Sequence, residues 1–149
     1  MSSEEERMNR LLAESRMLES TFNELTNRQG MIERMLIESR TSLDTIKELG
    51  STATDEVLVP VGAGILLRAS PPKADKVLVS IGANVVIEKT REEAEKILEE
   101  RAKNLEQNII TLISQRNQIA QRLETDRRTL QAFIDRQEHE QLPQPGQPR

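Results

Sequence analysis

The chain has 149 residues, of which 36% are apolar and 31% charged, and its formal net charge is −4. It has two Phe, no Tyr and no Trp, so it lacks the aromatic side chains that usually anchor a thick globular core. The acidic balance, with basic residues interleaved among acidic ones, argues against nucleic-acid binding, while the plentiful, regularly spaced Leu, Ile and Val exclude a disordered chain.

Residues 3–50 form the first predicted element, a coiled-coil helix. Apolar residues recur at positions a and d of a heptad sustained over six repeats, and nine of these twelve positions are apolar. Gly50 follows the last position of this seam and is suited to ending the helix. The a positions are Met8, Ser15, Phe22, Gln29, Leu36 and Leu43, and the d positions are Leu11, Leu18, Leu25, Ile32, Ser39 and Ile46.

Residues 55–89 contain the same short β-unit twice, as Val57–Ala69 and Val77–Lys89, twenty residues apart. Each copy has two runs of strand length on either side of a short triplet, Gly-Ala-Gly in the first copy and Gly-Ala-Asn in the second. Gly and Asn accept positive φ angles, so each triplet predicts a tight hairpin turn. Pro60 indicates an edge strand or a bulge, and residues 70–75 are a linker.

Two short hairpins without aromatic residues make a weak sheet. Their strands are apolar on both faces, and their open edges can pair with another chain. We therefore predict that this tandem module is an assembly device whose strands join a β-barrel shared between subunits. The residues expected to carry assembly are Val57, Val59, Pro60, Val61, Gly62, Gly64, Ile65, Leu67, Val77, Val79, Ile81, Gly82, Val85 and Ile87.

Residues 90–141 are the last predicted element, a second coiled-coil helix. Thr90 and Glu93 have the spacing of a capping box, in which each side chain binds the other residue's backbone N–H. The Pro-rich tail, residues 142–149, is expected to be disordered. The second heptad has d at Leu98, Leu105, Leu112, Ile119, Asp126 and Phe133, and a at Ala102, Ile109, Arg116, Leu123, Leu130 and Gln137.

The two helices have nearly equal lengths, which favours antiparallel pairing within one chain. One antiparallel register places a polar exception of the first seam opposite a polar exception of the second, namely Ser15 opposite Asp126. Two layers match less well: Gln29 faces Leu112, and Leu25 faces Arg116, whose charged end can reach water along its alkyl stem. The other predicted layers pair Leu43 with Leu98, Ser39 with Ala102, Leu36 with Leu105, Ile32 with Ile109, Phe22 with Ile119, Leu18 with Leu123, Leu11 with Leu130 and Met8 with Phe133.

The ends of the two helices away from the hairpins are the candidate binding site for non-native proteins. Beyond Met8 and Phe133 the seam has no apolar pair, so we expect fraying that exposes apolar side chains for weak, multivalent contacts. Residues in the seam can instead be purely structural, and both interpretations remain open for Met8, Leu11, Leu130 and Phe133. The candidate residues are Met8, Leu11, Leu12, Leu130, Phe133, Ile134 and Leu142.

The sequence offers no catalytic, metal or cofactor site. The lone Gly-x-Gly at Gly62 leads into a strand instead of a helix, so it does not predict phosphate binding. His139 is the only histidine and lies in a polar terminus, and there is no Cys. The acidic start does not have the form of a signal peptide, and no apolar run approaches membrane-spanning length. We expect a soluble, cytoplasmic protein that is not an enzyme.

The hairpin module, with "VPVGAG" at Val59–Gly64 and "VSIGAN" at Val79–Asn84 between two long helices, resembles the alpha subunit of archaeal prefoldin. The resemblance covers about residues 5–140. Alpha-class subunits have two hairpins and beta-class subunits one, so the resemblance implies the alpha class. The chain departs from the family pattern after the first turn, where Ile65-Leu66 replaces a small polar residue followed by an aromatic one.

The resemblance implies an α+β fold and a hexamer of two alpha and four beta subunits on a double β-barrel platform. It also implies an ATP-independent chaperone, a holdase, that captures unfolded proteins at the coiled-coil tips and delivers them to a group II chaperonin. The alternative is a filament-forming or spacer protein, similar to gamma-type prefoldin, whose β-hairpins join identical copies.

Overall fold

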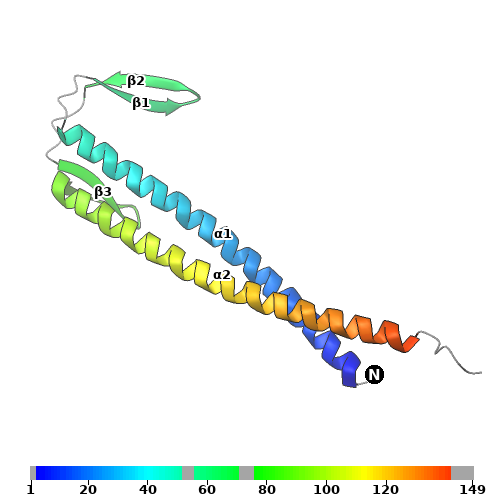
Figure 1. Ribbon diagram of the computed structural model, residues 1–149. Coiled ribbons are helices and arrows are strands. Elements are labelled where there is room, and N and C mark those ends of the chain that lie inside the picture. Colours follow the sequence, from blue (N-terminus) through cyan, green and yellow to red (C-terminus); the bar gives the residue numbers. More distant parts are fainter. Residues whose placement is uncertain (1–2, 52–55, 71–75, 142–149) are drawn as a thin grey trace, which may run out of the picture. The chain divides into compact units, whose positions relative to one another are not determined.

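The computed structural model describes residues 3–51, 56–70 and 76–141. Its elements follow in the order α1 (Ser3–Ser51), β1 (Val57–Gly62), β2 (Ile65–Ala69), β3 (Lys76–Gly82), β4 (Val85–Thr90) and α2 (Arg91–Gln141) (Figure 1). Two long helices with two β-hairpins between them give the predicted α+β fold.

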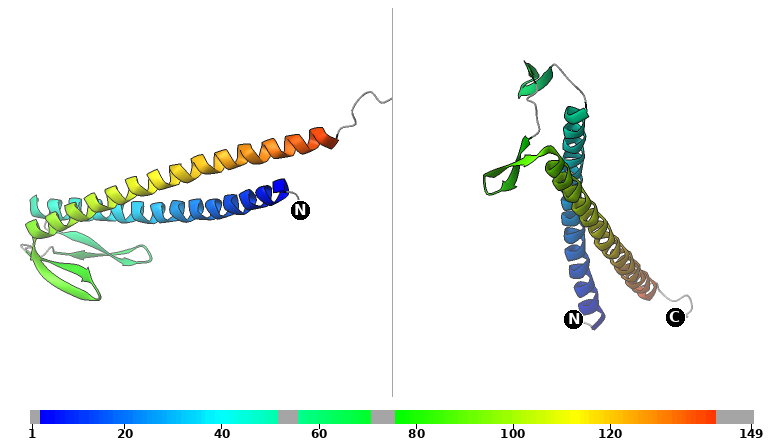
Figure 2. Two further views of the ribbon diagram at one scale, coloured as in Figure 1. Left: turned by 90° about the horizontal axis from the view of Figure 1, so that it is seen from below. Right: turned by 90° about the vertical axis from the view of Figure 1, so that its left-hand side faces the viewer.

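The chain divides into two compact units. We call residues 1–31 with 109–149 the tip unit and residues 32–108 the hairpin unit. In each unit a segment of α1 lies antiparallel to a segment of α2, and in the tip unit the start of α1 and the end of α2 lie at the same end (Figure 2). The predicted disordered tail and the candidate residue Leu142 lie outside the described residues.

α1 begins at Ser3, and α2 begins at Arg91, one residue after its predicted start. The first turn of α1 carries Glu4, Glu5 and Glu6, whose negative charges favour the positive end of the helix dipole. At the start of α2 the Thr90 N–H donates to Glu93 Oε2 at 3.0 Å, and the Glu93 N–H donates to Thr90 Oγ1 at 3.2 Å. The predicted capping box is thus confirmed. At the other end, α1 continues one residue beyond Gly50.

The seam residues are less exposed than the rest of each helix. Every predicted a and d position is buried or half-buried except Gln137, which is exposed. In the hairpin unit the buried apolar core contains Leu36, Ala102 and Leu105. The only other buried residue of this unit's predicted seam is Ser39, which the register places opposite the small Ala102. The heptads therefore locate the core correctly.

The register of the tip unit is confirmed by a polar contact in its core. Ser15 Oγ donates to Asp126 Oδ2 at 3.5 Å, and Asp126 is 1% exposed. In the layer with Arg116, the guanidinium does not simply extend to water, because its carbon lies 5.6 Å from the centre of the Phe22 ring. A cation above a ring face is stabilised by the ring's quadrupole, which compensates for a charged residue in the seam.

The two hairpins form separate two-stranded antiparallel sheets with the same register. Val59 pairs with Leu67 in the first, and Val79 pairs with Ile87 in the second. In both sheets the register shifts just before the turn, between Pro60 and Gly62 and at the corresponding place in the second hairpin. Pro60 thus lies on an edge strand beside a bulge, as its missing N–H predicts.

Both turns adopt the left-handed backbone that the sequence predicts. Ala63 and Gly64 have φ angles of 50° and 78°, and Ala83 and Asn84 have 49° and 59°. Two consecutive positive φ angles define a type I′ turn, which matches the twist of the flanking strands. Nothing lies within 4 Å of a Cβ placed on Gly64, so backbone conformation rather than space selects glycine there.

Candidate functional site

The first hairpin, β1–β2, exposes apolar side chains on both faces. Of the predicted assembly residues, Val59, Val61, Ile65 and Leu67 are exposed, with Ile65 at 59%. Leu58 and Leu66 point to the opposite face, because successive strand residues alternate, and they are also exposed. Since water contact with this much apolar surface is unfavourable, the hairpin is suited to being covered by another chain.

The second hairpin, β3–β4, presents two different faces. Its alternate residues Val77, Val79 and Ile87 are half-buried. A cavity of about 230 Å³ lies between β3 and the helices of the hairpin unit, and Ile46 and Leu98 are among its lining residues. One face of this hairpin therefore lies against its own chain.

The outer face of β3–β4 carries residues that are missing from the sequence-based candidate list. Leu78 is 76% exposed and Val86 53%. Near the turn the predicted residues Ile81 and Val85 are exposed as well. The sequence predicts apolar residues on both faces, because "VLVPV" and "VLVSI" are apolar at consecutive positions, but the individual assembly residues predicted for β3–β4 do not include Leu78 and Val86.

The candidate residues for client binding fall into two groups in the tip unit. Phe133 is buried, and its ring centre lies 5.9 Å from the guanidinium carbon of Arg7 and 5.3 Å from that of Arg136. The other seam candidates are half-buried, which agrees with packing in the seam, and their part in client binding stays a prediction. Leu12 and Ile134 lie outside the seam and are 37% and 45% exposed. The half-buried seam candidates are Met8, Leu11 and Leu130.

A groove of about 670 Å³ runs between the two helices of the tip unit. Leu12 and Ile134 line it, together with Phe22, Leu123 and Leu130. Its charged lining residues are Arg16, Glu19, Glu124 and Arg127. An apolar groove with charges of both signs around it can accept an extended apolar segment without selecting its net charge. Whether the ends of the helices fray stays a prediction.

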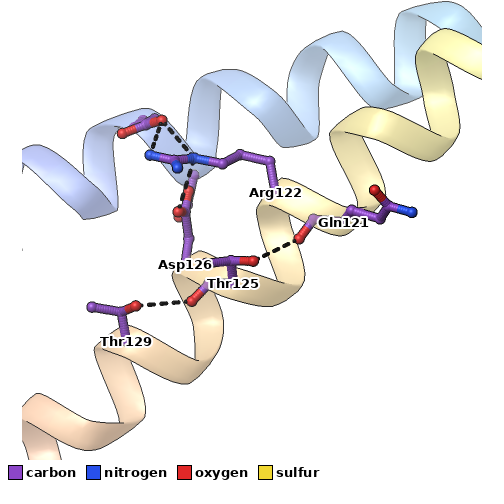
Figure 3. A network of polar contacts seen from close by, with 7 residues as sticks. Gln121, Arg122, Thr125, Asp126 and Thr129 are labelled. Carbon is purple, nitrogen blue, oxygen red and sulfur yellow. Dashed lines mark hydrogen bonds and ion pairs between the residues drawn. The ribbon is translucent and has the colours of Figure 1, made fainter.

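A layer of polar contacts surrounds the buried Asp126 of the tip unit (Figure 3). Arg122 Nε lies 3.2 Å from Asp126 Oδ1, and its guanidinium also donates to Glu14 Oε1 at 3.1 and 2.9 Å. Arg122 thus joins a buried carboxylate of α2 to an exposed carboxylate of α1. Because Ser15 of α1 also donates to Asp126 of α2, this layer makes two polar links between the helices.

Neither a metal-binding cluster nor a membrane-spanning helix is found in the described parts of the chain. Among these residues there is no group of three or more His, Cys, Asp or Glu side chains that could hold a metal ion. No described helix has the length and hydropathy needed to cross a membrane. What remains are two kinds of apolar surface, one on the hairpins and one in the tip unit.

Comparison with known proteins assigns this architecture to a family. The family model described as prefoldin subunit matches residues 18–136, which include both helical segments and both hairpins. The chain belongs to the prefoldin subunit family. Prefoldin subunits are non-enzymatic chaperones that form oligomers, so the family agrees with a chain whose prominent features are assembly and binding surfaces.

A solved structure has the same prefoldin fold. The cryo-EM structure of filamentous PFD from Methanocaldococcus jannaschii is similar to this chain with a TM-score of 0.65 and 29% sequence identity. The match covers 78% of this chain and 95% of that one. Comparison with proteins of curated function finds no significant match. The family is thus established, whereas the alpha class implied by the resemblance stays a prediction.

Proposed function

We propose that this prefoldin subunit joins copies of itself through its two β-hairpins and binds non-native proteins in the tip-unit groove, without nucleotide, in the cytoplasm. The observation that carries the proposal is the exposed apolar surface of the hairpins. In β1–β2 both faces are exposed, and in β3–β4 the outer face is exposed. Among the described residues, the two separate two-stranded sheets also leave an outer edge of each of their strands unpaired.

The similar solved structure favours an open assembly. That protein is filamentous, and nearly its whole length aligns with this chain. If a subunit has two different apolar surfaces, the first surface of one copy can bind the second surface of the next. Such head-to-tail contacts produce a filament unless the rotation between subunits closes a ring. The filament that the sequence offers as an alternative therefore becomes the preferred form of assembly.

The binding of non-native protein rests on the tip unit. Its groove combines exposed Leu12 and Ile134 with half-buried Leu130, and it lies between the N-terminal part of α1 and the C-terminal part of α2. Assembly would place many such grooves on one particle. Weak contacts at several points then add up to useful retention of an unfolded chain, because each further contact is intramolecular.

One experiment tests this binding. The double variant Leu12→Gln/Ile134→Gln is compared with the unaltered protein in suppressing aggregation of a chemically unfolded client, without ATP. We expect the variant to lose most of its protection while keeping its helix content, because both side chains are exposed. The matched control is Ile110→Gln, which changes a 60% exposed residue of the same unit that does not line the groove. Equal protection by all three proteins would reject the tip groove as the client site.

A second candidate is a holdase subunit in a closed hexamer of two alpha and four beta subunits that delivers clients to a group II chaperonin. It is favoured by the paired turns, whose Gly-Ala-Gly and Gly-Ala-Asn triplets resemble the alpha class. The two candidates differ in their need for a single-hairpin beta-type subunit. A discrete hexamer that forms only in a mixture with such a subunit would establish the second candidate and reject the first.

A further inference from the structure

The duplicated hairpins carry ion pairs of opposite orientation. In β1–β2 the acid precedes the base, and Arg68 Nε lies 3.7 Å from Glu56 Oε1. In β3–β4 the base precedes the acid, and Lys76 Nζ lies 3.7 Å from Glu88 Oε1. The twenty-residue offset makes Lys76 the counterpart of Glu56, and Glu88 the counterpart of Arg68. The two copies of the β-unit therefore have inverted charges at equivalent positions.

The apolar pattern around these charges is not inverted. Leu58 pairs with Arg68 in the first hairpin, and Leu78 pairs with Glu88 in the second. Both sheets also have the same register and the same shift before the turn. The two hairpins thus share their backbone register and similar apolar side chains, although one face of β3–β4 lies against its own helices. At these equivalent positions, the sign of the charge distinguishes one hairpin from the other.

The four charged side chains are accessible to another molecule. Those of Arg68 and Lys76 are 80% and 66% exposed, and those of Glu56 and Glu88 are 49% and 59% exposed. Exposed pairs at this separation contribute little to the stability of one hairpin. Their orientation can nevertheless decide which strand lies favourably beside which, because opposite charges on neighbouring strands attract and like charges repel.

We propose that hairpin β1–β2 of one copy pairs with hairpin β3–β4 of the next, with β2 beside β4 in parallel register. Equivalent residues are then neighbours, so Arg68 lies beside Glu88 and Leu66 beside Val86. The same alignment between two β2 strands would place Arg68 beside Arg68. The edge of β1 is less suitable because Pro60 and the bulge interrupt it. The proposal rests on the proposed self-assembly and adds its direction: first hairpin to second hairpin.

Charge-swap variants test this direction. Glu56→Lys/Arg68→Glu reverses the first hairpin but keeps an ion pair within it, and adding Lys76→Glu/Glu88→Lys reverses both hairpins. Light scattering at increasing concentrations gives the midpoint of self-assembly for each protein. We expect the single-hairpin swap to raise that midpoint about tenfold at low salt, and the swap of both hairpins to restore it. In 1 M NaCl the difference should shrink, because the Debye length falls to about 3 Å.

Controls and alternative outcomes separate this proposal from the one on which it rests. Lys47→Glu/Glu99→Lys swaps a similarly exposed pair between α1 and α2, and we expect no change in the midpoint. If the unaltered chain assembles but the single-hairpin swap leaves the midpoint unchanged, like hairpins pair with like and the inference is wrong. A loss that the swap of both hairpins fails to restore also overturns it. If the unaltered chain does not self-assemble, the proposed function itself fails.

Discussion

Asp126→Asn is the substitution that most directly probes the helical pair. It removes one negative charge from the buried layer but retains a side chain of nearly the same shape, which can still accept a hydrogen bond from Ser15. The main loss is the charge-assisted contact with Arg122, whose Nε lies 3.2 Å from Asp126 Oδ1. Arg122 keeps Glu14 as a partner, so the substitution leaves no isolated buried cation.

The expected cost follows from these contacts. A hydrogen bond to a charged group contributes about 1.5–3 kcal/mol. The Arg122 side chain is 53% exposed, so solvent screens part of this contribution, and we expect Asp126→Asn to lower the free energy of unfolding by roughly 1–2 kcal/mol. For a chain of this size that corresponds to a fall in Tm of roughly 3–8 °C. Circular dichroism melting at one fixed protein concentration measures it.

A matched control and an opposite change sharpen the result. Asp135→Asn makes the same substitution at an exposed residue that accepts a bond from Gln131 Nε2 at 2.9 Å, and it should change Tm little. Replacing both Ser15 and Asp126 by Leu should leave stability equal or higher, because apolar residues often replace a buried charged layer at no cost. If Asp126→Asn and Asp135→Asn have the same Tm, the buried carboxylate of Asp126 does not stabilise the helical pair.

Four further predictions concern the cap of α2, the first hairpin turn and the seam. Thr90→Ala should cost about 1 kcal/mol in thermal unfolding, because it removes the hydroxyl that caps α2. The hydrogen bond from the Thr90 backbone N–H, and then the charge of Lys89, lower the pKa of Glu93 below its usual 4.5. The stability that the Glu93 carboxylate contributes is therefore complete above pH 4.5 and is lost as the pH falls through the lowered pKa. Glu93→Gln should thus reduce Tm at pH 7 but not at pH 2. Gly64→Val should weaken self-assembly in light scattering, since a β-branched residue is strained at a φ of 78°. Phe133→Ala should lower the free energy of unfolding by roughly 3–5 kcal/mol in melting experiments, because it empties a buried site.

Each of these has a result that would contradict it. A Thr90→Ser variant keeps a capping hydroxyl and should melt close to the unaltered protein; equal loss in Ser and Ala variants would point to another cause. The cap contributes nothing through Glu93 if Glu93→Gln has no effect at either pH. Assembly of Gly64→Val at the midpoint of the unaltered chain would show that the turn tolerates strain. An unchanged Tm for Phe133→Ala would mean that the Phe133 side chain is not packed in the core at the end of the seam.

The long-range pairing of the helices could be predicted because its signals are discrete. Each heptad has three polar exceptions, and only one antiparallel register brings Ser15 of the first opposite Asp126 of the second. The capping box gave the start of α2 for a similar reason, since Thr90 and Glu93 have a fixed spacing. In both cases a specific polar contact, rather than general hydrophobicity, determined the position.

The hairpin surfaces were harder to predict. The strands are apolar on both faces, so no alternation between apolar and polar residues indicates which face is exposed, and the exposed Leu58, Leu66 and Leu78 are not among the predicted assembly residues. The extent to which Val77 and Val79 are covered depends on helices distant in sequence, which no local pattern records. The position of Arg116 over Phe22 likewise depends on side-chain direction within a layer that the heptad describes only by its spacing.

The central claim is that the duplicated hairpin joins copies of this chain, and its mass in solution tests this most directly. The purified chain would be measured by light scattering on a sizing column, alone and after mixing with a single-hairpin beta-type subunit. We predict large homo-oligomers that grow with concentration and do not need the beta-type subunit. A stable monomer in both samples would contradict the claim.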